Sequence, residues 1–238
     1  MEGRLIVIEG MDGAGKNTQA TRVYNRLIRE GFKVIRVSFP NYDNESSVLV
    51  KKYLNGDYKN QYGKDNITFV KQICSFYMVD RISSFIEEKY DGKSLLQHLK
   101  EGTHIICDRY TTSNMLHQAA NLTNKKHIYS LIDWIEDREY YDLGLPVPDI
   151  VFFLDVPPEI SIQNIKKRYE GENKEDLHEN LEHLKRVYQV KNRVVKYCDW
   201  EIINCVNENN EMLKEYRIYK QILKILKRTF KEFKKIKL

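Results

Sequence analysis

The sequence predicts an α/β domain in which a parallel sheet of five strands carries helices on both faces. Short apolar runs rich in β-branched residues alternate with helical patterns, which is typical of strands buried on both faces and joined by crossover helices. A glycine-rich turn follows the first run, and charged residues follow others. Because ligands of such sheets gather at the carboxyl ends of the strands, we expect the chemistry at that edge.

Each predicted element follows from its own pattern and from the turn residues that bound it. The strands are the apolar runs at residues 5–8, 33–39, 104–107, 150–154 and 200–205. The helices are the segments with helical apolar spacing, at residues 18–30, 47–55, 67–89, 93–101, 112–120, 126–139, 159–169, 177–197 and 211–238. Gly31 and Gly102 end two of these helices, and Pro40 ends a strand.

The composition predicts one globular domain. At 238 residues the chain suits a single domain over 1–238 better than two, and 42% hydrophobic residues supply a substantial core. The net charge of +5 suits polyphosphate ligands, among many others. The chain enters its first strand directly and holds no apolar run of about 18 residues. We therefore expect no signal peptide, no membrane partner and a cytoplasmic location.

The cysteines predict buried thiols rather than a metal site. Cys74, Cys107, Cys198 and Cys205 are scattered and form no C-x-x-C pair, so zinc is not expected. Cys107 and Cys205 fall within apolar, strand-like stretches, which indicates buried thiols. Free thiols fit a reducing compartment.

The glycine-rich turn after the first strand has the spacing of a phosphate-binding loop, G-x-x-x-x-G-K. Gly10, Gly13 and Gly15 allow backbone N–H groups to turn inward around anionic oxygens, and the next helix adds its positive N-terminus. Lys16 supplies a mobile cation for the outer phosphates. A glycine-rich turn that binds nothing is the alternative, but strand, glycines, lysine and helix all occur in order.

Asn17 departs from the usual pattern of this loop. It stands where a serine or threonine usually ligates magnesium, and Thr18 follows it. An amide oxygen is a weaker ligand than a hydroxyl polarised by the metal. The sequence therefore leaves direct ligation of magnesium by this loop open.

Asp108, Arg109 and Tyr110 follow the third strand directly. A carboxylate and a guanidinium at a strand end that faces a phosphate loop suit phosphoryl transfer. The arginine can bridge two phosphates, and the aspartate can orient magnesium-bound water. A structural ion pair at the sheet edge is the alternative, and the nearby phosphate loop makes it the weaker one.

Two further segments can recognise a base or a sugar. Tyr77 and Arg81 lie four residues apart on one helix face, where a ring can stack on a base and a guanidinium can bond to its edge. The spacing alone fits a surface pair better. Ser113, Asn114 and His117 come one helical turn after the Asp-Arg-Tyr segment. Asn114 can read a donor and an acceptor of a base or cap a helix, and nothing local decides the role of His117.

Basic residues flank a polar loop that contains a glycine, at residues 170–175. If this loop closes as a lid, Lys166, Lys167, Arg168 and Lys174 can reach a transferring phosphoryl group from which water is excluded. A solvated basic helix end fits equally well. The basic C-terminal helix fits packing with a solvated face, so we expect no nucleic-acid partner.

Together these motifs resemble those of thymidylate kinases, over residues 4–205, and look most like the bacterial branch. The matching segments are Ile-Glu-Gly-x-Asp-Gly-x-Gly-Lys-x-Thr-Gln, Phe39-Pro40, Asp108-Arg109-Tyr110, Gly144-Leu-Pro-x-Pro-Asp149, Leu154-Asp155-Val156 and the Arg-Tyr-Glu lid region. The resemblance implies a P-loop nucleoside monophosphate kinase fold with a short lid at 166–180. It also implies transfer of the γ-phosphoryl group of ATP to dTMP, giving dTDP and ADP in dTTP biosynthesis, with Mg2+, by a homodimer.

The resemblance implies roles for the residues of the donor side and the reacting centre. The implied ATP-binding and catalytic residues are Gly10, Asp12, Gly13, Ala14, Gly15, Lys16, Asn17, Thr18, Asp108, Arg109 and Arg168. Arg109 would bridge the donor and acceptor phosphates, and Asp108 would lie near the magnesium ion, directly or through water. Some family members carry a catalytic arginine at the position of Gly13. Here the lid would supply it as Arg168, supported by Lys174.

The resemblance also implies the residues of the acceptor side. The implied dTMP-binding residues are Asp12, Tyr42, Tyr77, Arg81, Arg109, Ser113, Asn114, His117 and His178. Tyr42 would meet the phosphate and Tyr77 would stack on thymine. Arg81 would bond to base O4 and Asn114 to its N3 edge. His117 stands where family members place a tyrosine that disfavours ribose, so discrimination against ribonucleotides stays open.

Two other functions fit part of the pattern. A kinase for dUMP, CMP or a deoxynucleoside would use the same core. Arg81 and Asn114 favour a pyrimidine with O4 and N3–H, and Tyr42 and Arg109 favour a monophosphate acceptor. A nucleotide-binding switch without transfer activity would keep the phosphate loop but would need no acceptor site.

Overall fold

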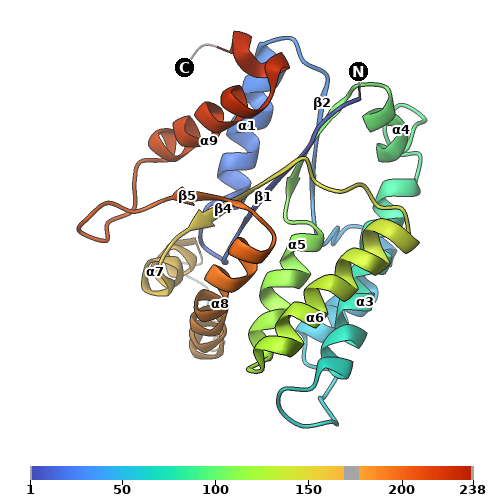
Figure 1. The fold of residues 1–238 in the computed structure, drawn as a ribbon, viewed down its shortest axis with the longest axis vertical. Coiled ribbons are helices and arrows are strands. Elements are labelled where there is room, and N and C mark those ends of the chain that lie inside the picture. Colours follow the sequence, from blue (N-terminus) through green and yellow to red (C-terminus); the bar gives the residue numbers. More distant parts are fainter. Residues whose placement is uncertain (1, 169–176, 237–238) are drawn as a thin grey trace.

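The computed structural model describes residues 2–168 and 177–236 (Figure 1). Within these residues, five strands form one parallel sheet in the order β2-β3-β1-β4-β5. The strands are β1 (Leu5–Gly10), β2 (Val34–Ser38), β3 (His104–Asp108), β4 (Ile150–Asp155) and β5 (Glu201–Asn204). The predicted parallel sheet of five strands is confirmed.

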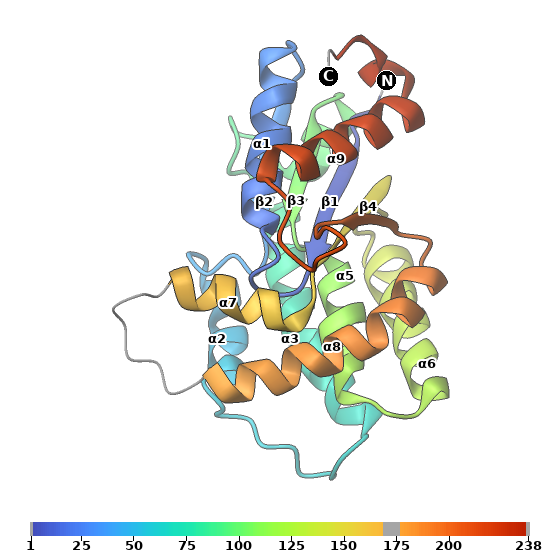
Figure 2. The same cartoon turned by 90° about the vertical axis from the view of Figure 1, so that its left-hand side faces the viewer.

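Helices connect the strands and cover both faces of the sheet (Figure 2). The α-helices are α1 (Lys16–Arg29), α2 (Val48–Leu54), α3 (Ile67–Ile86), α4 (Leu95–Lys100), α5 (Thr111–Ser113), α6 (Lys125–Glu136), α7 (Pro158–Arg168), α8 (Leu177–Tyr197) and α9 (Glu215–Thr229). Short 3-10 turns occupy Glu45–Ser47, Ala119–Asn121 and Lys231–Lys235, and π-helical turns occupy Asn114–Gln118 and Asp137–Asp142.

The central strand β1 shows why the strands are apolar throughout. Its side chains alternate between two cores, so that Leu5 and Val7 pack with residues of α3, α6 and α8. Ile6 and Ile8 pack instead with residues of α1 and α9. Every residue of β1 is buried, because helices lie on both faces of the sheet.

The register of the sheet brings the ends of three strands together. Ile8 of β1 pairs with Asp108 of β3, and Ser38 of β2 pairs with the same Asp108. The phosphate loop leaves β1 two residues further on, at Gly10. The polar residues that the sequence placed after separate strands therefore share one edge.

The expected helical segment over 112–120 is confirmed, but it is not one regular α-helix. The structure has three residues of α5, then a π-helical turn, then a 3-10 turn. The hydroxyls of Thr112 and Ser113 donate to the buried carboxylate of Glu9, which fixes the first turn against β1. The wider π-helical turn then carries Asn114 and His117, and such turns are frequent at functional sites.

The C-terminal helix is shorter at both ends than the expected 211–238. Asn207 accepts hydrogen bonds from the backbone of Asn209 and Glu211, which makes a turn, and α9 begins only at Glu215. The chain becomes extended at Phe230. The buried stripe of α9 confirms the predicted packing role, and its members are Ile218, Tyr219, Ile222, Leu223 and Leu226.

Cys107 and Cys205 are fully buried free thiols, as predicted, and Cys74 is buried as well. Burial raises the pKa of each thiol, so all three stay protonated at neutral pH. Among the helices of the described residues, none combines the length and the apolar character that a membrane crossing requires.

Candidate active site

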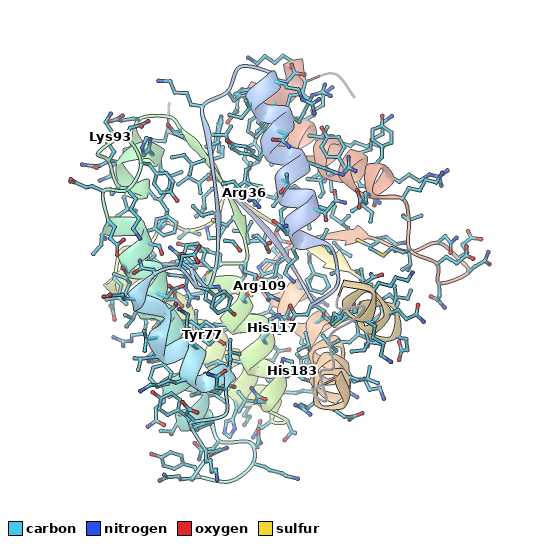
Figure 3. All side chains as sticks on the ribbon, turned by 180° about the vertical axis from the view of Figure 1, so that it is seen from behind. Arg36, Tyr77, Lys93, Arg109, His117 and His183 are labelled. Carbon is cyan, nitrogen blue, oxygen red and sulfur yellow. The ribbon has the colours of Figure 1, made fainter. Side chains whose placement is uncertain are left out.

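A cleft of about 1210 Å3 opens at the carboxyl ends of β1, β2 and β3. Most of the predicted site residues line it, namely Asp12, Gly13, Gly15, Lys16, Asn17, Tyr42, Tyr77, Arg81, Asp108, Arg109, Ser113, Asn114 and His117. Figure 3 shows Tyr77, Arg109, His117 and His183 gathered toward the middle of the molecule. His183 was not predicted, and neither were several other lining residues, among them Tyr53, Tyr58 and Gln118.

The phosphate loop is closed from one side by α7. Gly13 has a positive φ of 78°, and a Cβ atom there would lie 2.3 Å from the backbone oxygen of Ser161. Asn164 of α7 donates to the Gly13 carbonyl at 2.9 Å. Since the backbone of α7 fills the space, no side chain, and so no arginine, fits at residue 13.

Other loop residues shape the loop rather than line the cleft. The Gly10 N–H donates to Glu9 at 2.9 Å, and the Ala14 N–H donates to the Met11 carbonyl at 3.1 Å. Neither residue is among those that line the cleft, and the same holds for Thr18. The Asn17 amide oxygen accepts a hydrogen bond of 2.6 Å from Arg36, so a cation already holds the oxygen considered for magnesium.

Lys16 is a buried cation. Its ammonium donates to the Met11 carbonyl at 2.8 Å and lies 3.8 Å from the carboxylate of Asp12. Burial, with the positive charge of Arg109, lowers the pKa of Lys16 to about 8. A bound polyanion would offset the burial and the repulsion by Arg109, because it would stabilise the charged form of Lys16.

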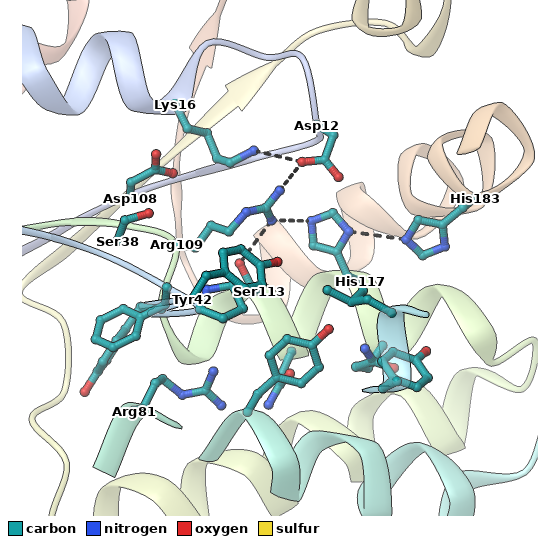
Figure 4. Close-up of a pocket in the computed structure, with 18 of the residues that line it drawn as sticks. Asp12, Lys16, Ser38, Tyr42, Arg81, Asp108, Arg109, Ser113, His117 and His183 are labelled. Carbon is teal, nitrogen blue, oxygen red and sulfur yellow. Dashed lines mark hydrogen bonds and ion pairs between the residues drawn. The ribbon is translucent and has the colours of Figure 1, made fainter. Parts of the chain in front are cut away.

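Arg109 occupies the centre of the cleft. Its backbone has a positive φ of 67°, which turns the chain sharply after β3. The guanidinium forms an ion pair with Asp12 and donates to His117 at 2.9 Å (Figure 4). It also lies 3.8 Å from the carboxylate of Glu9. The charge of Arg109 holds the pKa of Asp12 far below its usual range. Arg109 thus pairs with Asp12 rather than with its neighbour Asp108, which was the alternative.

Glu9 supports the site from behind the cleft, and the sequence interpretation missed it. Its side chain is fully buried and accepts hydrogen bonds from the Gly10 N–H, the Thr112 hydroxyl and the Ser113 hydroxyl at 2.7–2.9 Å. The indication in the sequence was a carboxylate that ends a strand buried on both faces, since such a charge needs partners.

Asp108 ends β3 with a buried carboxylate that lines the cleft. Burial raises its pKa, against the opposing charges of Lys16 and Arg109. Figure 4 shows the hydroxyl of Ser38 beside it, as their register in the sheet requires. In the described part of the chain, no group of three or more His, Cys, Asp or Glu side chains is placed to hold a metal ion.

Arg81 is buried, which corrects the alternative of a surface pair with Tyr77. Its Nε and Nη2 atoms donate to the two carboxylate oxygens of Glu139, each at 2.6 Å. Glu139 was also missed, although it continues the buried stripe of Ile132 and Ile135 on α6 and its π-helical end. A carboxylate in an apolar stripe is itself an indication of a buried partner.

Tyr77 and Asn114 lie beside Arg81. Tyr77 meets Tyr53 of α2 edge to face, with 6.4 Å between the ring centroids. Burial raises the pKa of Tyr77, so the ring stays neutral. Asn114 is buried, and its amide donates to the Cys74 carbonyl at 3.2 Å. The side chain of Asn114 therefore does not cap a helix N-terminus but links the π-helical turn to α3.

The lid residues lie outside this description. Lys174 falls in the segment between the described ranges, and the side chains of Arg168 and His178 lie outside the described residues as well. The backbone of Arg168 ends α7, and α8 begins at Leu177.

The Arg81–Glu139 pair generates a test of stability. Replacement Glu139→Gln leaves a guanidinium buried without a counter-charge, and we expect a loss of about 3–5 kcal/mol in the free energy of unfolding. Urea denaturation measures the loss. The double replacement Arg81→Met with Glu139→Leu removes both charges and should cost less than Glu139→Gln alone.

Asp137→Asn is the matched control for this experiment, because Asp137 is exposed on the same π-helical turn. We expect a change within about 0.5 kcal/mol. If Glu139→Gln cost no more than this control, the pair would not be isolated from water.

The family model for thymidylate kinase matches residues 8–231. Similar proteins include a probable thymidylate kinase of Staphylothermus marinus, which is 29% identical over 93% of this chain and 94% of its own length. The thymidylate kinase of Plasmodium falciparum is 25% identical over 90% of each chain. That of Caldicellulosiruptor saccharolyticus is 26% identical over 95% of this chain and 97% of its own.

A solved structure agrees in fold. The thymidylate kinase of Candida albicans has a TM-score of 0.64 with this chain, at 21% identity, and the match covers 95% of this chain and 92% of that one. The P-loop fold inferred from the sequence is confirmed. By its match over residues 8–231, the chain belongs to the thymidylate kinase family.

Proposed function

We propose that this chain transfers the γ-phosphoryl group of ATP to dTMP, giving dTDP and ADP, as a step of dTTP biosynthesis. One observation carries the proposal. The cation of the phosphate loop, Lys16, and the cation after β3, Arg109, both approach the carboxylate of Asp12 (Figure 4). Groups suited to a pyrimidine line the same cleft. Family membership names the substrates.

The charges of the cleft suit a phosphoryl group that passes between two phosphates. Lys16 would bind the outer phosphates of ATP, and Arg109 would bridge donor and acceptor oxygens. In the protein without ligand, the carboxylate of Asp12 pairs with both Lys16 and Arg109. When phosphate oxygens take over these cations, the carboxylate of Asp12 is free to accept from the sugar 3′-hydroxyl of dTMP. Tyr42 would meet the dTMP phosphate.

The acceptor end suits the base edge of thymine. Tyr77 would stack on the ring. Because Nε and Nη2 of Arg81 are held by Glu139, its Nη1 atom is the group that can donate to O4. Asn114 donates through its amide nitrogen to Cys74, so its oxygen can accept from N3–H. Ser113, His117 and His178 would complete the dTMP site.

We propose Mg2+ as the metal, held by Asp108 directly or through water. The donor fits, because Asp108 is a buried oxygen ligand beside the Ser38 hydroxyl, and a cation would offset the burial that raises its pKa. Bound magnesium would supply positive charge to the phosphate oxygens. Asn17 would have to release Arg36 to join the ligands.

We propose that residues 166–180 form a lid that brings Arg168 to the transferring phosphoryl group, with Lys174 in support. The packing of α7 against Gly13 supports this, because it excludes an arginine from the loop itself. Arg168→Ala should lower kcat about a hundredfold or more and change the KM for dTMP little. Lys224→Ala, which removes an exposed cation of α9 that does not line the cleft, is the control. An unchanged kcat in Arg168→Ala would contradict the assignment.

We also propose a cytoplasmic homodimer of the bacterial branch, without nucleic-acid or membrane partners. Val79 and Ile86 on α3 are 49% and 58% exposed, and a second copy would cover these apolar groups. Sedimentation velocity at assay concentration tests the dimer, and a monomer alone would contradict it. The relatives come from archaea, eukaryotes and bacteria, so the branch stays a prediction.

The first functional test measures ADP release from magnesium-ATP with dTMP, dUMP, UMP, CMP or thymidine as acceptor. We expect strong preference for dTMP and loss of turnover with EDTA. Arg109→Met should abolish turnover with every acceptor, since it removes the phosphate bridge. Comparable turnover of UMP or CMP would indicate a broader nucleoside monophosphate kinase. Turnover independent of any acceptor would indicate a nucleotide hydrolase or switch.

The lowered pKa of Lys16 predicts how ATP affinity depends on pH. ATP favours charged Lys16, and the free protein loses this charge as the pH rises through about 8. We therefore expect the Kd for ATP to be independent of pH near and below pH 7. Above pH 8 we expect it to rise by up to about tenfold per pH unit. Calorimetry with a non-hydrolysable ATP analogue measures it. Lys16→Met should bind weakly at every pH, and a flat profile in the unaltered chain would contradict the prediction.

A further inference from the structure

Two imidazoles link Arg109 to α8. Nη1 of Arg109 lies 2.9 Å from Nε2 of His117, and Nδ1 of His117 lies 3.4 Å from Nε2 of His183 (Figure 4). The two ring planes are nearly parallel, with 5.6 Å between centroids and 20° between planes. His183 lies on α8, six residues beyond its start at Leu177, so the chain of contacts crosses from the end of β3 to the helix after the lid segment.

The chemistry of the donors fixes the direction of every bond in this chain. A guanidinium has no acceptor, so Arg109 must donate and Nε2 of His117 must accept. A neutral imidazole with an unprotonated Nε2 carries its proton on Nδ1, which then donates to His183. His183 must in turn accept at Nε2 and carry its own proton on Nδ1.

We infer that His183 is a positioning residue for Arg109. By accepting a hydrogen bond from Nδ1–H of His117, it stabilises the one tautomer of His117 whose Nε2 can hold the guanidinium. This inference rests on the proposed function only where it concerns the phosphates that Arg109 would bridge. The orientation of Arg109 then depends on α8 as well as on Asp12 and Glu9.

The surroundings keep both rings neutral, as this network requires. His117 faces the cations of Arg109 and Lys16 and the carboxylate of Asp12, while Arg186 adds a positive charge near His183. Burial, helped by the neighbouring cations, lowers the pKa of both imidazoles. A protonated His117 would have two donors and could no longer accept from Arg109.

The test compares His183→Phe, which keeps an aromatic ring but removes the acceptor, with His183→Gln, whose side-chain oxygen can replace Nε2. Long-range proton–nitrogen correlation spectra report the tautomer of His117 without any substrate. We expect the Nδ1–H tautomer in the unaltered chain and in His183→Gln. In His183→Phe, an appreciable fraction should shift to the Nε2–H tautomer, since a buried donor would otherwise lack a partner.

Kinetics with dTMP supply the second measurement. His183→Phe should lower kcat/KM about fivefold to tenfold, the equivalent of one lost hydrogen bond, and His183→Gln should restore most of it. Lys185→Ala, an exposed neighbour on α8, is the control that should leave it unchanged. An unchanged His117 tautomer in His183→Phe would overturn the inference, as would equal kinetic losses in the two His183 variants. If the unaltered chain failed to phosphorylate dTMP, the proposed function would be wrong, but the spectra would still decide the role of His183.

Discussion

The geometry of the cleft depends on the hydrogen bonds of one buried carboxylate, that of Glu9. It accepts hydrogen bonds from the start of the phosphate loop at Gly10 and from the hydroxyls of Thr112 and Ser113, and it faces Arg109 at 3.8 Å. A buried carboxylate without such partners would cost several kcal/mol. The fold therefore forms with all of them in place, and the ends of β1 and β3 become one rigid edge.

The charges at this edge of the sheet favour the binding of an anionic ligand. Lys16 and Arg109 share the half-exposed carboxylate of Asp12, while Asp108 stays buried at the end of β3. Burial lowers the pKa of Lys16 and raises that of Asp108, which shows that each charge is held at a cost. Phosphate oxygens with a divalent cation would relieve both costs at once.

Two helices, α7 and α8, contact residues at the edge of the cleft. The backbone of α7 packs against Gly13 so closely that it leaves no room for a side chain there. On α8, the buried Lys191 forms an ion pair with the partly exposed Asp155 at the end of β4, and His183 contacts His117.

The sequence by itself determined the sheet, the phosphate loop and most side chains of the cleft, because each depends on a local pattern of apolar residues, glycines and strand ends. It did not determine which charged side chains form ion pairs with one another. Arg81 meets Glu139 and Arg109 meets Asp12, contacts across 58 and 97 residues of chain. The tertiary structure alone decided these pairings and the place of His183, because burial and register, not spacing, bring distant polar groups together.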